Sequence, residues 1–108
     1  MSNNVKENII DYVIRNFDFI LVAEIMEKLD WKSVNSCQSN GIMSVAKLRA
    51  LATNLISDAY DHIHGSGVRE YELERNMFRV IAWTDNAGEV DSVRLSFVLT
   101  DCSYYITN

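Results

Sequence analysis

Proline is absent from this sequence of 108 residues, and cysteine and glycine are scarce, with two and four residues. Without proline, no helix or strand is interrupted by a residue that lacks a backbone N–H group. The two cysteines, Cys37 and Cys102, are too few for a disulfide framework, and lone thiols in a chain without a secretion signal are more often buried or inert. We therefore expect no disulfide to hold the fold.

Long hydrophobic runs are also missing. The longest one, Phe19–Ala23, is far shorter than the roughly 20 residues that a membrane-spanning helix needs. The polar start, MSNNVKEN, does not have the pattern of a signal peptide. A chain of this length fits one domain. We expect a single domain over residues 1–108 that is located in the cytoplasm and has no membrane partner.

Positive charge is in deficit, since 10 lysines and arginines face 15 aspartates and glutamates, which gives a net charge of −5. Such a chain repels a nucleic-acid backbone, so we expect no nucleic-acid polymer as a partner. The acidic residues are scattered and do not form the long blocks that are typical of nucleic-acid mimics. A small anionic ligand remains compatible, because two or three converging arginines can hold it whatever the net charge.

The sequence does contain 48% hydrophobic and 23% charged residues, which are ordinary values for a globular protein. This composition favours a folded chain over a disordered one. Three stretches repeat apolar residues with the helical period. The predicted helices span Val5–Asn16, Asp18 to about Asp30, and Ser44–His64. The expected N-caps are Asn4, which forms a capping box with Glu7, and then Asp18 and Ser44. Gly65 is the expected stop of the third helix.

After Gly67 the hydrophobic period changes to two, which predicts strands. The clearest strands are Phe78–Trp83 and Val93–Thr100, joined as an antiparallel hairpin by the turn residues Asp85–Gly88. Weaker strand patterns cover Val68–Leu73 and Tyr104–Ile106, and Lys32–Ile42 has the composition of a loop. We predict an α+β fold in which three N-terminal helices pack on a C-terminal antiparallel sheet of three to four strands.

Catalytic patterns are weak. Asp58 and His62 have the i, i+4 spacing that could orient an imidazole, but an ordinary solvated pair on a helix has the same spacing. His62 and His64 are two residues apart, so on a helix they cannot clamp one metal ion. Ser66 lies between two glycines after a helix, which is typical of helix termination and not of a phosphate loop. We expect neither an enzyme nor a bound metal or cofactor.

Arginines and aromatic residues, in contrast, occur together in the second half of the chain. Rings can stack on a nucleobase and guanidinium groups can hold phosphates. The candidate ligand-binding residues are Arg49, Phe78, Arg79, Trp83 and Arg94. Arg79 and Arg94 could face each other across two strands, an unfavourable arrangement unless an anion lies between them. The alternative is that Phe78 fills the core and the arginines form an ordinary solvated face.

Several short motifs resemble a phage-encoded family that includes the anti-Thoeris sponges. They are FDF followed by M-x-x-L-D-W at Phe17–Trp31, G-I-M-S-V at Gly41–Val45, a turn at Ser66–Gly67, and L-S-F-V at Leu95–Val98. The chain departs from the family's pattern where Met43 replaces a proline. The resemblance implies a protein that binds a cyclic ADP-ribose isomer, the signal of a bacterial immune system, and holds it without cleaving it.

If the resemblance holds, the partner is a small cyclic nucleotide. A chain this short rarely encloses such a ligand alone, so we expect a pocket between the subunits of a homo-oligomer, a dimer or larger. The edge strand at Tyr104–Ile106 is one surface for that contact. Two alternatives stay open: a phage inhibitor that acts by protein–protein binding, as anti-CRISPR proteins do, and a phosphodiesterase that destroys the cyclic nucleotide.

Overall fold

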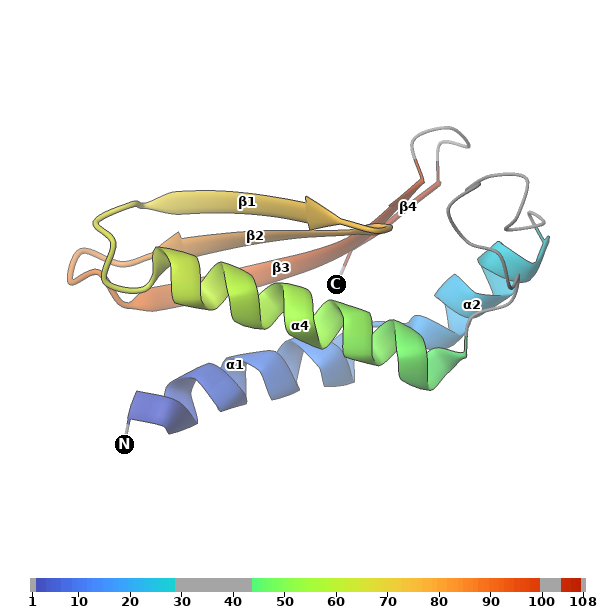
Figure 1. Ribbon diagram of the computed structural model, residues 1–108, viewed down its shortest axis with the longest axis horizontal. Coiled ribbons are helices and arrows are strands. Elements are labelled where there is room, and N and C mark those ends of the chain that lie inside the picture. Colours follow the sequence, from blue (N-terminus) through green and yellow to red (C-terminus); the bar gives the residue numbers. More distant parts are fainter. Residues whose placement is uncertain (1, 29–43, 100–103, 108) are drawn as a thin grey trace.

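The computed structural model describes residues 2–28, 44–99 and 104–107. Along the chain its elements are α1 (Ser2–Asn16), α2 (Phe19–Lys28), α4 (Val45–Ile63), β1 (Glu70–Arg75), β2 (Phe78–Thr84), β3 (Val90–Leu99) and β4 (Tyr104–Thr107). The helices precede the sheet and pack together on one side of it (Figure 1). The α+β class and the order of helices before strands are thus confirmed. The predicted loop, both cysteines and the expected end of the second helix lie outside the described residues.

Two of the three predicted helix starts are confirmed by side-chain caps. The carboxylate oxygen Oδ1 of Asp18 accepts a hydrogen bond of 3.0 Å from the backbone N–H of Leu21 at the start of α2. The hydroxyl oxygen of Ser44 accepts one of 3.1 Å from the N–H of Lys47 at the start of α4. The predicted start of the first helix is wrong. α1 begins at Ser2, so Asn4 lies inside its first turn and does not cap it.

The sheet has the strand order β1-β2-β3-β4, and each neighbouring pair is antiparallel. The predicted hairpin joins β2 and β3, with Phe78 opposite Phe97. Its turn is held by Asp85, whose Oδ1 accepts hydrogen bonds from the backbone N–H groups of Ala87, at 2.9 Å, and Glu89, at 3.0 Å. Gly88 has a φ of 85°, a conformation that costs glycine little, so this turn needs the glycine that the sequence supplies.

A second tight turn, which the sequence analysis did not identify, joins β1 to β2. Arg75 and Phe78 are paired, so Asn76 and Met77 alone form the connection. Asn76 has a φ of 59°, in the left-handed region that asparagine tolerates better than most residues. The signal was present in the sequence as an asparagine between two strand-like stretches.

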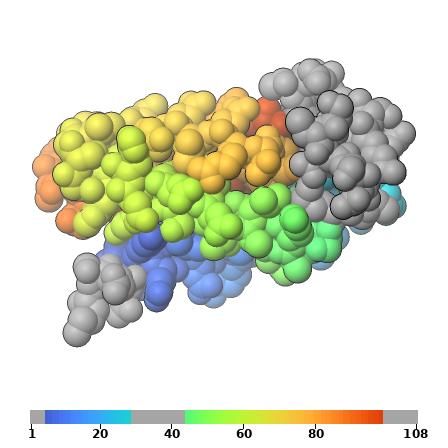
Figure 2. Space-filling view, viewed as in Figure 1, coloured from blue at the N-terminus to red at the C-terminus, as the bar shows by residue number. Residues whose placement is uncertain are grey.

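Burial along β2 alternates at every residue, as the period of a half-covered strand requires. Phe78 and Val80 point to the helices and are fully buried, as are their partners on β3, Phe97 and Leu95. The rings of Phe17 and Phe19 meet Phe78 with centroids 6.1 and 6.0 Å away, in the tilted geometry that aromatic rings favour. α4 packs against β1, β2 and β3 and so closes this side of the sheet (Figure 2).

No helix of the described residues lies on the other side of the sheet (Figure 1). The register places these residues of the first three strands there: Glu70, Glu72, Glu74, Arg79, Ile81, Trp83, Ser92, Arg94 and Ser96. Ser96 is buried, and we call the other eight the open face. The same strands thus carry a covered apolar side and an uncovered side rich in charge.

Candidate functional site

The open face brings together three of the five residues predicted to bind a ligand, Arg79, Trp83 and Arg94. Trp83 is half-buried and lies opposite Glu70 on β1. The indole Nε1 donates a hydrogen bond of 2.9 Å to the Glu70 carboxylate. On β3, the guanidinium carbon of Arg94 lies 5.7 Å from the centroid of the Trp83 ring. Three neighbouring strands thus contribute a carboxylate, an indole and a guanidinium group to one diagonal row, since Trp83 is opposite Ser92 and Arg94 is two residues further along β3.

Arg94 is exposed, as is Glu70, whereas Trp83 is half-buried. Within the part of the chain that the structure describes, Arg94 makes no ion pair with a carboxylate, and its guanidinium group lies near the Trp83 ring. A cation near an indole ring is stabilised by the negative face of the ring, which orients it without neutralising it. The guanidinium group therefore keeps its donors available for an anion.

Arg79 is engaged differently, because two carboxylates of β1 surround it. Its Nε lies 3.3 Å from Glu72, and its Nη2 lies 3.1 Å from Glu74. The register places Arg79 opposite Ser96 and Arg94 opposite Ile81, so the two arginines are diagonal neighbours. The expectation that they face each other directly is wrong, and the glutamates of β1 balance the charge of Arg79 without a bound anion.

The glutamates of β1 are a feature that the sequence analysis did not connect with the arginines. Glu70, Glu72 and Glu74 alternate along the strand and all point to the open face. The signal was the regular spacing of acidic residues in EYELER, but only the pairing of β1 with β2 shows which basic residue they meet.

The other two predicted residues lie elsewhere. Phe78 is fully buried and packs against Phe97, with ring centroids 6.1 Å apart, so it presents no ring face to a ligand. This is the alternative in which Phe78 fills the core. Arg49 lies on α4, on the helical side of the sheet, where its guanidinium carbon is 5.9 Å from the ring centroid of Phe19. Neither residue can meet Arg94 in this arrangement.

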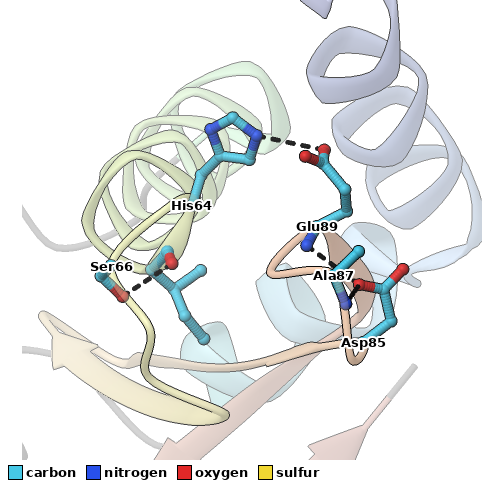
Figure 3. Close-up of polar contacts among 6 residues, drawn as sticks. His64, Ser66, Asp85, Ala87 and Glu89 are labelled. Carbon is cyan, nitrogen blue, oxygen red and sulfur yellow. Dashed lines mark hydrogen bonds and ion pairs between the residues drawn. The ribbon is translucent and has the colours of Figure 1, made fainter.

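At one end of the sheet, the loop after α4 meets the turn between β2 and β3 (Figure 3). His64 Nε2 lies 3.2 Å from the carboxylate of Glu89, which links the end of α4 to that turn. The hydroxyl of Ser66 donates a hydrogen bond of 2.8 Å to the carbonyl of Ile63 and accepts one of 3.2 Å from the N–H of Val68. Ser66 therefore serves the loop backbone, and in Figure 3 the imidazole of His64 points away from it, toward Glu89.

Asp58 and His62, which have the i, i+4 spacing of a possible catalytic pair, do not pair with each other. Asp58 instead makes an ion pair of 2.9 Å with Arg75, and His62 stacks on Tyr71 with ring centroids 4.0 Å apart. The alternative of an ordinary helix surface describes these residues better than a catalytic one.

Tyr60 is a buried titratable group at the same end of the sheet. Burial raises the pKa of its hydroxyl above the usual value of 10.0, and the carboxylates of Glu89 and Asp61 raise it further, while Lys6 lowers it. A phenol in this environment stays protonated at neutral pH, so it can act as a hydrogen-bonding group but not as a base.

A groove of about 280 Å³ lies between α1 and the start of β3. It is lined by Asn8, Ile9, Tyr12, Val13, Asp91, Ser92 and Val93, and we call it the edge groove. None of the five predicted ligand-binding residues lines it. No pattern in the sequence predicts this groove, because it forms where two distant segments meet and neither segment has a motif of its own.

Within residues 2–28, 44–99 and 104–107, no three His, Cys, Asp or Glu side chains are grouped so that they could hold a metal ion. None of the helices that the structure describes is long and apolar enough to cross a membrane. No protein-family model, curated protein or solved structure matches the chain. The resemblance to the anti-Thoeris sponges therefore rests on the short motifs of the sequence.

Proposed function

We propose that the open face binds a small cyclic nucleotide of the cyclic ADP-ribose type and sequesters it without cleaving it. The observation that carries this proposal is the position of Arg94 beside Trp83 on a side of the sheet that no described helix covers. The pair combines a flat ring for a nucleobase with a cation for a phosphate.

Each residue of the row has a separate role in this proposal. The Trp83 ring stacks on the base, and Glu70 fixes the orientation of the ring through its hydrogen bond to Nε1. Arg94 turns its donors toward a phosphate oxygen. Arg79 stays with Glu72 and Glu74, so it shapes the neighbouring surface and does not bind the anion.

The binding free energy that one open face can supply favours a ligand held between two copies of the chain. Stacking of one base contributes about 1–3 kcal/mol, and a hydrogen bond to a charged group contributes about 1.5–3 kcal/mol. Together they reach about 6 kcal/mol at most, whereas nanomolar binding needs about 12 kcal/mol. A second open face, related by a twofold axis, would double these contacts and exclude water. We therefore propose a homodimer with the ligand enclosed at its interface.

A binding and recovery experiment tests the proposal. Purified protein is titrated with cyclic ADP-ribose isomers by calorimetry, and the complex is then heat-denatured so that the released nucleotide can be identified by chromatography. We expect saturable binding, one ligand site for each twofold interface, and intact nucleotide after release. Release of a cleaved product would support the phosphodiesterase alternative, and absence of binding to every isomer would contradict the proposal.

A matched pair of variants locates the site. Arg94→Gln should weaken binding about tenfold or more, because one charge-assisted contact is lost. Arg15→Gln is the control, since Arg15 is also exposed but lies on α1, on the helical side of the sheet. Equal losses in both variants would show that net charge, and not the open face, governs binding.

A further inference from the structure

The edge groove lies where one edge of the sheet is left without a partner strand. β4 pairs with β3 only from Ser96 to Leu99. The last of these pairs joins Ser96 to Thr107. The first half of β3, which includes Asp91 and Val93, lies beyond this pair, and α1 flanks it there. Among the described residues, no strand pairs with this part of the edge.

Three consecutive residues of β3 line the groove, namely Asp91, Ser92 and Val93. Trp83 pairs with Ser92 and Thr84 pairs with Val90, so Asp91 lies at a bulge, where the alternation of side chains is interrupted. Ser92 and Val93, which follow the bulge, point to opposite faces of the sheet, so the backbone edge of the strand between them faces the groove.

The hydrogen-bond pattern of β3 shows which backbone groups face the groove. The N–H of Val98 donates a hydrogen bond of 2.9 Å to the carbonyl of Met77, at the β2 side of β3. Backbone groups alternate along a strand, so the N–H and C=O of Val93, five residues earlier, point to the opposite edge. A strand that exposes such groups is a template for another extended segment.

The side of the groove formed by α1 is mainly apolar, with Asn8 as its polar residue. Ile9 and Val13 belong to the inner side of that helix, and Tyr12 has 63% of its surface exposed, a large fraction for an aromatic side chain. An extended segment beside Val93 would direct every second side chain toward these residues, because Val93 itself points to the helical side of the sheet.

Charge at the end of the groove distinguishes between possible occupants. Asp91 is exposed and makes no ion pair within the described part of the chain. The whole chain carries a net charge of −5, so its field attracts a basic segment during encounter.

From these observations we infer that the edge groove binds an extended, basic peptide segment of a partner protein, which adds to β3 as an antiparallel strand. Antiparallel pairing is the arrangement that β4 already has on the same edge. The segment places an apolar residue opposite Val93, against Ile9 and Tyr12, and a lysine or arginine two residues later, beside Asp91. This surface shares Ser92 with the open face but contains neither Trp83 nor Arg94, and it does not depend on nucleotide binding.

A labelled hexapeptide with the sequence Ser-Ser-Val-Thr-Lys-Ser is the probe, and its fluorescence anisotropy is measured as the protein is added. In the antiparallel register, the N–H of the peptide valine donates to the carbonyl of Val93, while the N–H of the following threonine points away from β3. Methylation of the valine nitrogen should therefore weaken binding about tenfold, and methylation of the threonine nitrogen should leave it unchanged. Equal effects of the two methyl groups would overturn strand addition.

Two exposed residues of the protein give a matched control. Tyr12→Ala removes the aromatic wall of the groove and should weaken binding severalfold, whereas Ile20→Ala, at 61% exposure on α2, should not change it. Asp91→Asn should remove the preference for lysine over glutamate at the fifth peptide position. Arg94→Gln should leave peptide binding intact, which separates this site from the proposed nucleotide site.

Two results would contradict the inference. One is the absence of binding to the probe at protein concentrations up to the solubility limit. The other is a self-association, measured by analytical ultracentrifugation, that Tyr12→Ala abolishes and Ile20→Ala does not, because a second copy of the chain would then occupy the groove.

Discussion

The two faces of β2 differ sharply although their residues alternate along one strand. Phe78 and Val80 are fully buried on the helical side, whereas Arg79 and Trp83 lie half-buried on the open face among glutamates and Arg94. The buried side gains its stability from water exclusion and close packing. The open side contributes little of this kind, so its residues can be exchanged without loss of the fold.

The largest expected difference between the faces concerns their aromatic residues. Phe78→Ala should lower the free energy of unfolding by about 3–5 kcal/mol, because it leaves a cavity among Phe17, Phe19 and Phe97. Trp83→Ala should lower it by about 2 kcal/mol at most, since it removes one exposed hydrogen bond and one cation–π contact. Urea unfolding of both variants measures the difference. Equal losses would mean that the open face is covered in solution.

A smaller contrast is expected between two neighbouring residues that receive the same side chain. Val80→Thr buries a hydroxyl at a position with no exposed surface and should cost about 1–3 kcal/mol. Ile81→Thr places the hydroxyl on the open face and should cost less than about 1 kcal/mol. Thermal unfolding by circular dichroism compares them. A larger loss for Ile81→Thr would reverse the assignment of the two faces.

The smallest effect concerns Tyr60, which packs beneath the helical side of the sheet with Ala82 and Val90. Its pKa is raised in the folded state, so folding favours the protonated phenol. The resulting stabilisation is fully present below the unfolded-state value of 10.0 and is lost as the pH rises through the higher folded-state value. The free energy of unfolding should fall as the pH rises above the unfolded-state value of 10.0, and less so in Tyr60→Phe. An identical pH profile for both proteins would contradict this.

Local features of the fold could be predicted well. The caps at Asp18 and Ser44 and the hairpin turn at Asp85–Gly88 depend on residues a few positions apart, whose hydrogen bonds are the same in any surrounding. β3 begins at Val90, three residues before the predicted start at Val93. Its alternation is broken where the register between β2 and β3 shifts, and a pattern of period two is lost at such an irregularity.

The candidate site could be predicted only in part. Phe78 and Arg79 were both expected at the ligand, yet neighbours on a strand point to opposite faces, so the sequence pattern already excluded that combination. Arg79 and Arg94 could not be separated in this way. Their different surroundings depend on Glu72 and Glu74, which reach Arg79 because β1 pairs with β2 in one particular register.

The sequence by itself determined which segments become helices and strands, and which residues alternate together along each strand. Capping, turn formation and hydrophobic period act over a few residues and need no distant partner. Only the tertiary structure decided that the helices cover a single side of the sheet, that Arg94 lies beside Trp83, and that α1 flanks the unpaired edge of β3. These outcomes depend on contacts between segments far apart in the chain, whose geometry is set by strand register and helix packing together.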